Sequence, residues 1–278
     1  MDKQTKTQIT ELIIYPVKSL AGISLQTSDL DSMGLKYDRR WMLVTPDGKF
    51  LSQRQIPKMA LIKTALDKAG QLTLSADGMR DHPVPDVKEL STPVFMPVAI
   101  WDDTVHATRV GDETDIWLSN ALGTLCHLVY IPDNEERQCD LKYAKQGDRT
   151  GFSDGFPLLL LSEASLADLN NRLDEPVEMK RFRPNIVISG CDAYAEDQLK
   201  GFTIGDVSMR GVKLCSRCVI TTVDPDTGKR NNMQPLATLM KYRKGKGDEA
   251  NKVFFGMNVI HENTGRLNVG DSVSIGNN

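Results

Sequence analysis

The chain has 278 residues, of which 40% are hydrophobic and 26% are charged, and its formal net charge is −3. This length allows one large or two ordinary domains, and the lack of a basic excess argues against a nucleic-acid partner, because phosphates require a basic surface. No apolar run reaches the ~18 residues of a membrane-spanning helix, and the polar first ten residues carry no signal segment, so we expect a cytoplasmic protein with no membrane partner.

Short β-strands dominate the first half of the predicted chain. A helix interrupts them, with Asp112 or Thr114 as its cap and Gly123 after its end. The four prolines of residues 83–97 indicate a loop or an edge strand, and the polar residues 133–151 indicate a mobile loop. The predicted strands are 12–17, 41–44, 49–51, 61–66, 71–74, 98–101, 105–108 and 125–130.

The second half of the chain repeats this pattern with two helices. Residues 162–173 predict a helix capped by Ser162 or Ser165, and residues 235–242 predict a short helix that begins on proline. Together the two halves indicate a mainly β protein with some α-helix and barrel-like architecture. The predicted strands are 157–161, 185–190, 202–204, 207–209, 212–214, the β-branched run 219–223, 254–260 and 273–275, with turns at Gly205-Asp206 and Arg210-Gly211.

The most distinctive local motif is Cys215-Ser-Arg-Cys218, which we interpret as a buried thiolate site. Five cysteines are too few and too scattered for a disulfide scaffold, so reduced thiols are expected. A thioredoxin-type pair would need a following helix, whereas a β-branched run follows Cys218. A structural zinc site would need four ligands, and no second pair of this spacing occurs. Two thiols packed at the entry to a strand remain the third alternative.

Basic side chains recur at predicted strand ends and beside this motif. Lys18-Ser19 and Arg39 follow or precede strands in the first half, Arg183 stands close to Asn185 in the second half, and Arg217 separates the two cysteines. Each arginine alone could be solvated or paired with an acidic residue. Together they favour an anionic ligand, because arginine binds phosphate through two parallel hydrogen bonds. A soft metal held by sulfur and an anionic cofactor would explain both features.

Four segments of the chain resemble MOSC-domain proteins, in particular the group of the mitochondrial amidoxime-reducing component and its bacterial relatives. The similarity extends from about residue 10 to residue 275 and is most specific in the last two of these segments. They are residues 15–19 (YPVKS), 162–170 (SEASLADLN), 182–190 (FRPNIVISG) and 215–225 (CSRCVITTVDP).

The resemblance implies the fold and the cofactor. Residues 1–125 would form the MOSC N-terminal β-barrel-like domain, whose first strand and Lys18-Ser19 loop reach the cofactor site, and residues 126–278 would form the MOSC β-barrel domain that binds the molybdenum cofactor (molybdenum bound to molybdopterin). Cys218 would be the metal ligand and the catalytic cysteine. Gly155 and Phe156 stand where this group often has Thr-Ser. The implied cofactor contacts are Lys18, Ser19, Arg39, Gly155, Phe156, Arg183, Asn185, Ser216, Arg217 and Cys218.

The resemblance also implies the reaction, which is the two-electron reduction of small N-hydroxylated compounds such as amidoximes or hydroxylaminopurines. Some bacterial relatives carry a C-terminal ferredoxin-like domain, but this sequence has no C-x₄-C-x₂-C spacing. We therefore expect electrons from a separate donor, either a flavoprotein reductase or a ferredoxin-type protein. A sulfur carrier or cofactor-handling protein that uses a cysteine persulfide is the alternative, and a non-catalytic cofactor-storage module is a third reading.

Overall fold

The computed structural model describes residues 6–230 and 232–275, and its largest element is an eight-stranded mixed sheet. All neighbouring strands in this sheet pair antiparallel except β12 and β13, which are parallel and are joined through helix α2 (Glu163–Asn170). The order of the strands is β18 (Val273–Ile275), β14 (Gly201–Ile204), β15 (Val207–Ser216), β16 (Phe254–His261), β12 (Leu158–Ser162), β13 (Ile186–Ser189), β1 (Gln8–Ile14) and β2 (Ile23–Leu25).

Three smaller sheets accompany it. The four-stranded sheet has the order β5 (Trp41–Val44), β11 (His127–Tyr130), β10 (Asp103–Arg109) and β9 (Val94–Ile100). The two three-stranded sheets are β17 (Gly265–Asn268), β3 (Thr27–Asp31) and β4 (Gly34–Leu35), and β6 (Lys63–Leu66), β7 (Leu72–Ser75) and β8 (His82–Pro83). The fold is therefore mainly β, as predicted. Among the described residues no pair of named strands closes the eight-stranded sheet into a barrel, although a single antiparallel bridge links Gln8 of β1 to Ser272, just before β18.

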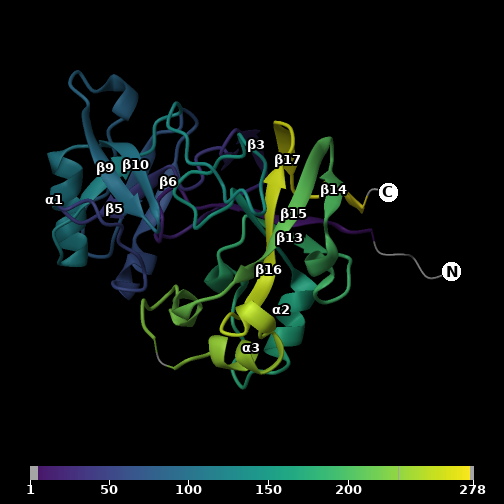
Figure 1. Ribbon diagram of the computed structural model, residues 1–278. Coiled ribbons are helices and arrows are strands. Elements are labelled where there is room, and N and C mark those ends of the chain that lie inside the picture. The colour runs from purple at the N-terminus through teal and green to yellow at the C-terminus, as the bar shows by residue number, and fades with distance from the viewer. Residues whose placement is uncertain (1–5, 231, 276–278) are drawn as a thin grey trace.

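The elements gather into two groups in space, as Figure 1 shows. The sheet that contains β5, β9 and β10 lies with α1 (Asp112–Leu122) on one side, and β12 to β16 lie with α2 and α3 (Leu236–Tyr242) on the other. Sequence halves and sheets do not coincide exactly. Strand β1 pairs with β13 in the large sheet, and β11 pairs with β5 in the smaller one. The first strand thus carries the following loop to the boundary between the two groups.

Local signals explain the elements that lead into the site. The apolar run of β12 is buried along its whole length, as expected for a strand covered on both faces. The hydroxyl of Ser162 accepts a hydrogen bond from the backbone N–H of Ser165 at 3.0 Å, so Ser162 is the cap of α2, as predicted. Helix α1 is followed by Gly123 in the left-handed conformation, as expected, but its N-cap is Gly111, and neither Asp112 nor Thr114 caps it.

Two further local predictions were wrong. The β-branched residues after Cys218 form a 3₁₀ helix, η5 (Val219–Thr222), and not a strand. Arg210-Gly211 is not a turn, because both residues lie inside β15 and pair with its neighbours. Residues 133–151 form a loop with no helix or strand, as predicted, and Arg137 and Cys139 within this loop are buried and so help to cover the core. No described helix is long and apolar enough to cross a membrane.

Candidate cofactor site

All ten predicted site residues line one cavity between the two groups of elements. The space between its walls is about 780 Å³, including the part that is open to solvent. Loops that follow or precede strands supply most of the walls. The predicted lining residues are Lys18, Ser19, Arg39, Gly155, Phe156, Arg183, Asn185, Ser216, Arg217 and Cys218.

Strained backbone helps to aim three of these residues. Ser19, Arg39 and Arg183 have φ angles of 69°, 47° and 55°, which place them in the left-handed region. Side chains other than those of glycine, asparagine and aspartate seldom adopt this conformation, and such outliers are concentrated at functional sites. The surrounding hydrogen bonds hold them there: for example, the backbone N–H of Arg39 donates to the carbonyl of Tyr15 at 2.9 Å.

Arg39 and Asn185 form the buried floor of the cavity. Arg39 Nη1 donates to Asp38 Oδ2 at 2.6 Å and to Asn185 Oδ1 at 2.9 Å. Asn185 also accepts from the backbone N–H of Leu159 at 3.2 Å and donates to the carbonyl of Ile13 at 3.1 Å. These two side chains therefore join β1, β12 and β13, so they have a structural role in addition to any contact with a ligand.

Two guanidinium groups lie against the same aromatic ring. Arg183 and Arg39 lie 4.1 and 4.4 Å from the centre of the Tyr15 ring. Arg183 Nη1 donates to the carbonyl of Leu20 at 2.7 Å, but its Nη2 is buried with no partner in the described structure. Burial, with repulsion from Arg39, lowers the pKa of Arg183 to about 10. This cation is thus held in place without a compensating anion on Nη2.

Arg217 is fixed in the same manner. Its Nε and Nη1 donate to the carbonyls of Phe255 and Phe182 at 2.7 and 2.9 Å, whereas its Nη2 is buried without a partner among residues 6–230 and 232–275. Nη1 of Arg54 is buried and equally unpaired there. A buried cationic donor without an acceptor is costly. Arg183 and Arg217 both line the cavity, and their two unpaired donors fit a ligand with anionic oxygens, such as a phosphate.

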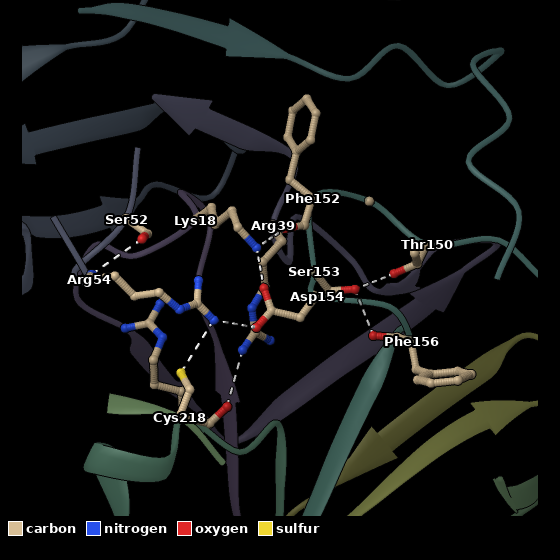
Figure 2. A network of polar contacts seen from close by, with 12 residues as sticks. Lys18, Arg39, Ser52, Arg54, Thr150, Phe152, Ser153, Asp154, Phe156 and Cys218 are labelled. Atoms are coloured by element: carbon tan, nitrogen blue, oxygen red, sulfur yellow. Dashed lines mark hydrogen bonds and ion pairs between the residues drawn. The ribbon is translucent and has the colours of Figure 1, made fainter. Parts of the chain in front are cut away.

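Lys18 and Asp154 form an ion pair across the cavity. Lys18 Nζ donates to Asp154 Oδ1 at 2.5 Å and to the carbonyl of Phe152 at 2.9 Å (Figure 2). Burial lowers the pKa of Lys18 to about 8 although Asp154 acts to raise it. Removal of water from around the carboxylate opposes ionisation of Asp154, but Lys18 and Arg54 outweigh this effect and hold its pKa well below the usual range. Asp154 is therefore an anion that a negatively charged ligand would approach.

The two cysteines of the motif differ in their surroundings. Both are free and only partly buried, so the predicted burial of the thiolate site was wrong. Burial raises the pKa of Cys215, and its sulfur lies 3.9 Å from the carbonyl oxygen of Ser216. Cys218 Sγ instead lies 3.2 Å from Nη2 of Arg54. A thiolate is the form that binds metals, so Cys218 is the better placed of the two.

The structure bears on the alternatives for this motif. Residues 219–223 do not form the predicted strand, so a following strand no longer excludes a thioredoxin-type pair. However, η5 is a single 3₁₀ turn and not the α-helix that such a pair requires. In the described part of the chain no group of three or more His, Cys, Asp and Glu side chains could hold a metal ion. A metal at Cys218 would thus take its other ligands from a cofactor.

Asp154, which lines the cavity, and Arg54, which contacts Cys218, are among the residues that were not predicted from the sequence. Arg54 follows the predicted strand 49–51, so the criterion that selected the other strand-end arginines would also have selected it. Asp154 directly precedes Gly155, but no local pattern marks it. Both contacts are long-range, since Arg54 is 164 residues from Cys218 and Lys18 is 136 residues from Asp154.

Comparisons with known proteins identify the family of this chain. The chain matches the MOSC N-terminal beta barrel domain over residues 6–125 and the MOSC domain over residues 147–274. Human mitochondrial amidoxime-reducing component 1 is 38% identical, with 95% of this chain and 82% of that protein covered. Rat mitochondrial amidoxime reducing component 2 is 37% identical with the same coverage.

A further relative is longer. Molybdenum cofactor sulfurase of Oryza sativa subsp. japonica is 32% identical, and the match covers 91% of this chain but only 32% of that protein. Two domain models in the expected order and relatives matched along most of their length establish the relationship. The chain belongs to the family of MOSC-domain proteins that includes the mitochondrial amidoxime-reducing components.

Proposed function

We propose that this chain binds the molybdenum cofactor and reduces N-hydroxylated compounds. The observation that carries the proposal is the combination of a partly exposed thiol, Cys218, with the buried N–H groups of Arg183 and Arg217, which line the same cavity and have no partner in the described structure. Such donors fit an anionic pterin phosphate, and a single cysteine fits a metal whose remaining ligands come from the cofactor. The names of the two amidoxime-reducing relatives support the reaction class.

The residues of the cavity would have different roles in binding the cofactor. Cys218 would be the protein ligand to molybdenum, which supplies the redox chemistry when it is bound. Lys18, Arg183 and Arg217 would bind the anionic part of the cofactor by charge-assisted hydrogen bonds. Ser19, Gly155, Phe156 and Ser216 would complete the cofactor contacts, while Arg39 and Asn185 hold the floor in position.

The proposed reaction is the conversion of an amidoxime to an amidine. The N–O bond breaks, two electrons and two protons are consumed, and the oxygen leaves as one molecule of water. The electrons would come from a separate flavoprotein reductase or ferredoxin-type protein. Redox encounters of this kind usually bury less than about 1,200 Å², so the partner would bind only transiently.

Protein purified from a host that makes the cofactor provides the test. Metal and pterin analysis should find close to one molybdenum and one pterin for each chain, and reduced viologen should drive the reduction of an aryl amidoxime. A protein with neither molybdenum nor pterin would refute the proposal. If the fully loaded protein does not turn over any N-hydroxylated compound, the proposed reductase activity is wrong and only a cofactor-storage role is left.

A sulfur-carrier function is the second candidate, favoured by the similarity to the sulfurase. In that case Cys218 would carry a persulfide, and a cyanide assay would release labile sulfane sulfur from it.

The cellular location and the division into two domains remain proposals as well. The two amidoxime-reducing relatives are called mitochondrial, and cell fractionation would test our proposed cytoplasmic location. Limited proteolysis would test the division into residues 1–125 and 126–278.

A further inference from the structure

Arg54 is the described residue whose charged side chain contacts the sulfur of Cys218. Its Nη2 lies 3.2 Å from Cys218 Sγ, as Figure 2 shows. We propose that Arg54 is a positioning residue for Cys218, which fixes the direction of the sulfur and raises the reduction potential of the metal bound there. This inference rests on the proposed function, because it concerns molybdenum at Cys218.

The guanidinium is held rigidly from outside the cavity. It lies 4.5 Å from the centre of the Trp101 ring. Arg230 Nη2 donates to the carbonyls of Gln53 and Arg54 at 2.6 and 3.0 Å, and Ser52 Oγ accepts from the backbone N–H of Arg54 at 3.2 Å. The backbone and the side-chain plane of Arg54 are therefore fixed before any ligand binds, which is what a positioning residue requires.

The position of Trp101 supports the role of Arg54 as a positioning residue. It lies at the tip of the β9–β10 hairpin, between the paired residues Ile100 and Asp103, and its φ is 55°. A bulky residue at positive φ is an outlier, because glycine, asparagine or aspartate normally occupies such a position. Trp101 is also 45% exposed, so burial of its own surface does not account for its place. The hairpin presents an aromatic face to Arg54.

The chemistry follows from the charge. A guanidinium that donates to a thiolate withdraws negative charge from the sulfur, and the sulfur then donates less to the metal. The reduced metal is stabilised relative to the oxidised one, so the potential rises. Asp154 opposes this effect, since its Oδ2 lies 3.8 Å from the same Nη2 and competes for it. Arg54 is thus shared between the sulfur and a carboxylate.

The test compares Arg54→Gln and Arg54→Lys with the wild-type holoprotein. The control is Arg266→Gln, because Arg266 pairs with Asp29 on the surface. Molybdenum and pterin content are measured first, and the Mo(V) electron paramagnetic resonance signal is then followed through a redox titration. We expect full cofactor content in each protein. In Arg54→Gln the potential should fall by about 59 mV, a tenfold change in the one-electron equilibrium, with altered g values. The potential of Arg54→Lys should lie between those of wild type and Arg54→Gln, and the potential of the control should match that of wild type.

Each other outcome overturns the inference. An Arg54→Gln protein with full cofactor content and the wild-type potential and spectrum would show that the contact with the sulfur has no effect. Loss of cofactor from both Arg54 variants would assign Arg54 to cofactor retention if the unfolding temperature is unchanged, and to the fold if it falls. If wild type itself contains no molybdenum, the proposed function fails first. Unchanged spectra in a loaded variant refute only the role of Arg54.

Discussion

Replacing Arg183 with glutamine should weaken cofactor binding and leave the cofactor-free fold as stable as before. Ordinary buried residues give the opposite result, because their removal destabilises the protein. Arg183 differs since its Nη2 is buried without a partner in the described residues, and burial lowers its pKa to about 10. The side chain is therefore arranged for a ligand and not for the stability of the empty protein.

The loss of affinity can be estimated from the unpaired donor. A hydrogen bond to a charged group contributes about 1.5–3 kcal/mol, so removing the cation should raise the dissociation constant roughly ten- to hundredfold. Arg183→Lys should retain part of the affinity, because lysine keeps the charge but cannot supply two parallel donors. The bond from Nη1 to the carbonyl of Leu20 would be lost in both variants.

The effect on stability combines two opposing contributions. A pKa that falls from 12.5 to about 10 corresponds to roughly 3 kcal/mol of unfavourable free energy for the buried charge. The glutamine variant removes this cost but loses the bond to Leu20 and the contact with Tyr15, which together contribute about 2 kcal/mol. The free energy of unfolding should thus be unchanged or slightly higher.

The assay measures pterin and molybdenum content together with thermal unfolding of the cofactor-free protein. Arg172→Gln is a matched control, since Arg172 also lies over a tyrosine, 4.3 Å from the Tyr242 ring, but pairs with Asp168 on the surface. The control should retain full cofactor. Wild-type cofactor occupancy in Arg183→Gln, or a large fall in its unfolding temperature, would refute the reasoning.

Three further predictions concern other parts of the site. Cys218→Ser should abolish activity and change the molybdenum spectrum, whereas Cys215→Ser should keep a measurable fraction of activity; full activity in Cys218→Ser would contradict the ligand assignment. Because burial lowers the pKa of Lys18 to about 8 in the folded protein from its ordinary value of 10.5, the unfolded chain binds more protons between these values. The free energy of unfolding should therefore rise by up to about 3 kcal/mol between pH 8 and pH 10.5 relative to Lys18→Met, and parallel pH profiles for the two proteins would rule this out. Finally, the loaded chain should not reduce an amidoxime with NADH or NADPH alone but should do so with reduced viologen; robust turnover with NADH and no added protein would show that no separate donor is needed.

The sequence alone determined the elements whose signals are local. The buried apolar run of β12, the serine cap of α2 and the glycine after α1 were all recognisable, because each depends on residues within one turn or strand. The strand-end cations and the cysteine pair were also recognisable from their neighbours, whereas the choice of Cys218 as the ligand came from the family resemblance. The structure places all ten predicted residues around one cavity, and their roles stay predictions.

Only the tertiary structure decided the elements in which context overrides propensity. The β-branched residues after Cys218 form η5 because the carbonyl of Cys218 accepts from the N–H and the hydroxyl of Thr221 at 3.1 and 3.0 Å, and strand propensity depends strongly on context. Gly211 lies inside β15 and not in a turn. A side chain there would collide with the carbonyl of Leu199, so the glycine permits close packing of the two backbones.

The same holds for the electrostatics of the site. The contact of Arg54 with Cys218 and that of Lys18 with Asp154 join residues more than a hundred positions apart. No pattern of local spacing reports such a contact, because it exists only once β1 has joined the large sheet and the loop after Leu51 has packed beside η5. The kinds of residue in the site were therefore readable from the sequence, but which cation faces the sulfur was decided by the packing of the two groups of elements.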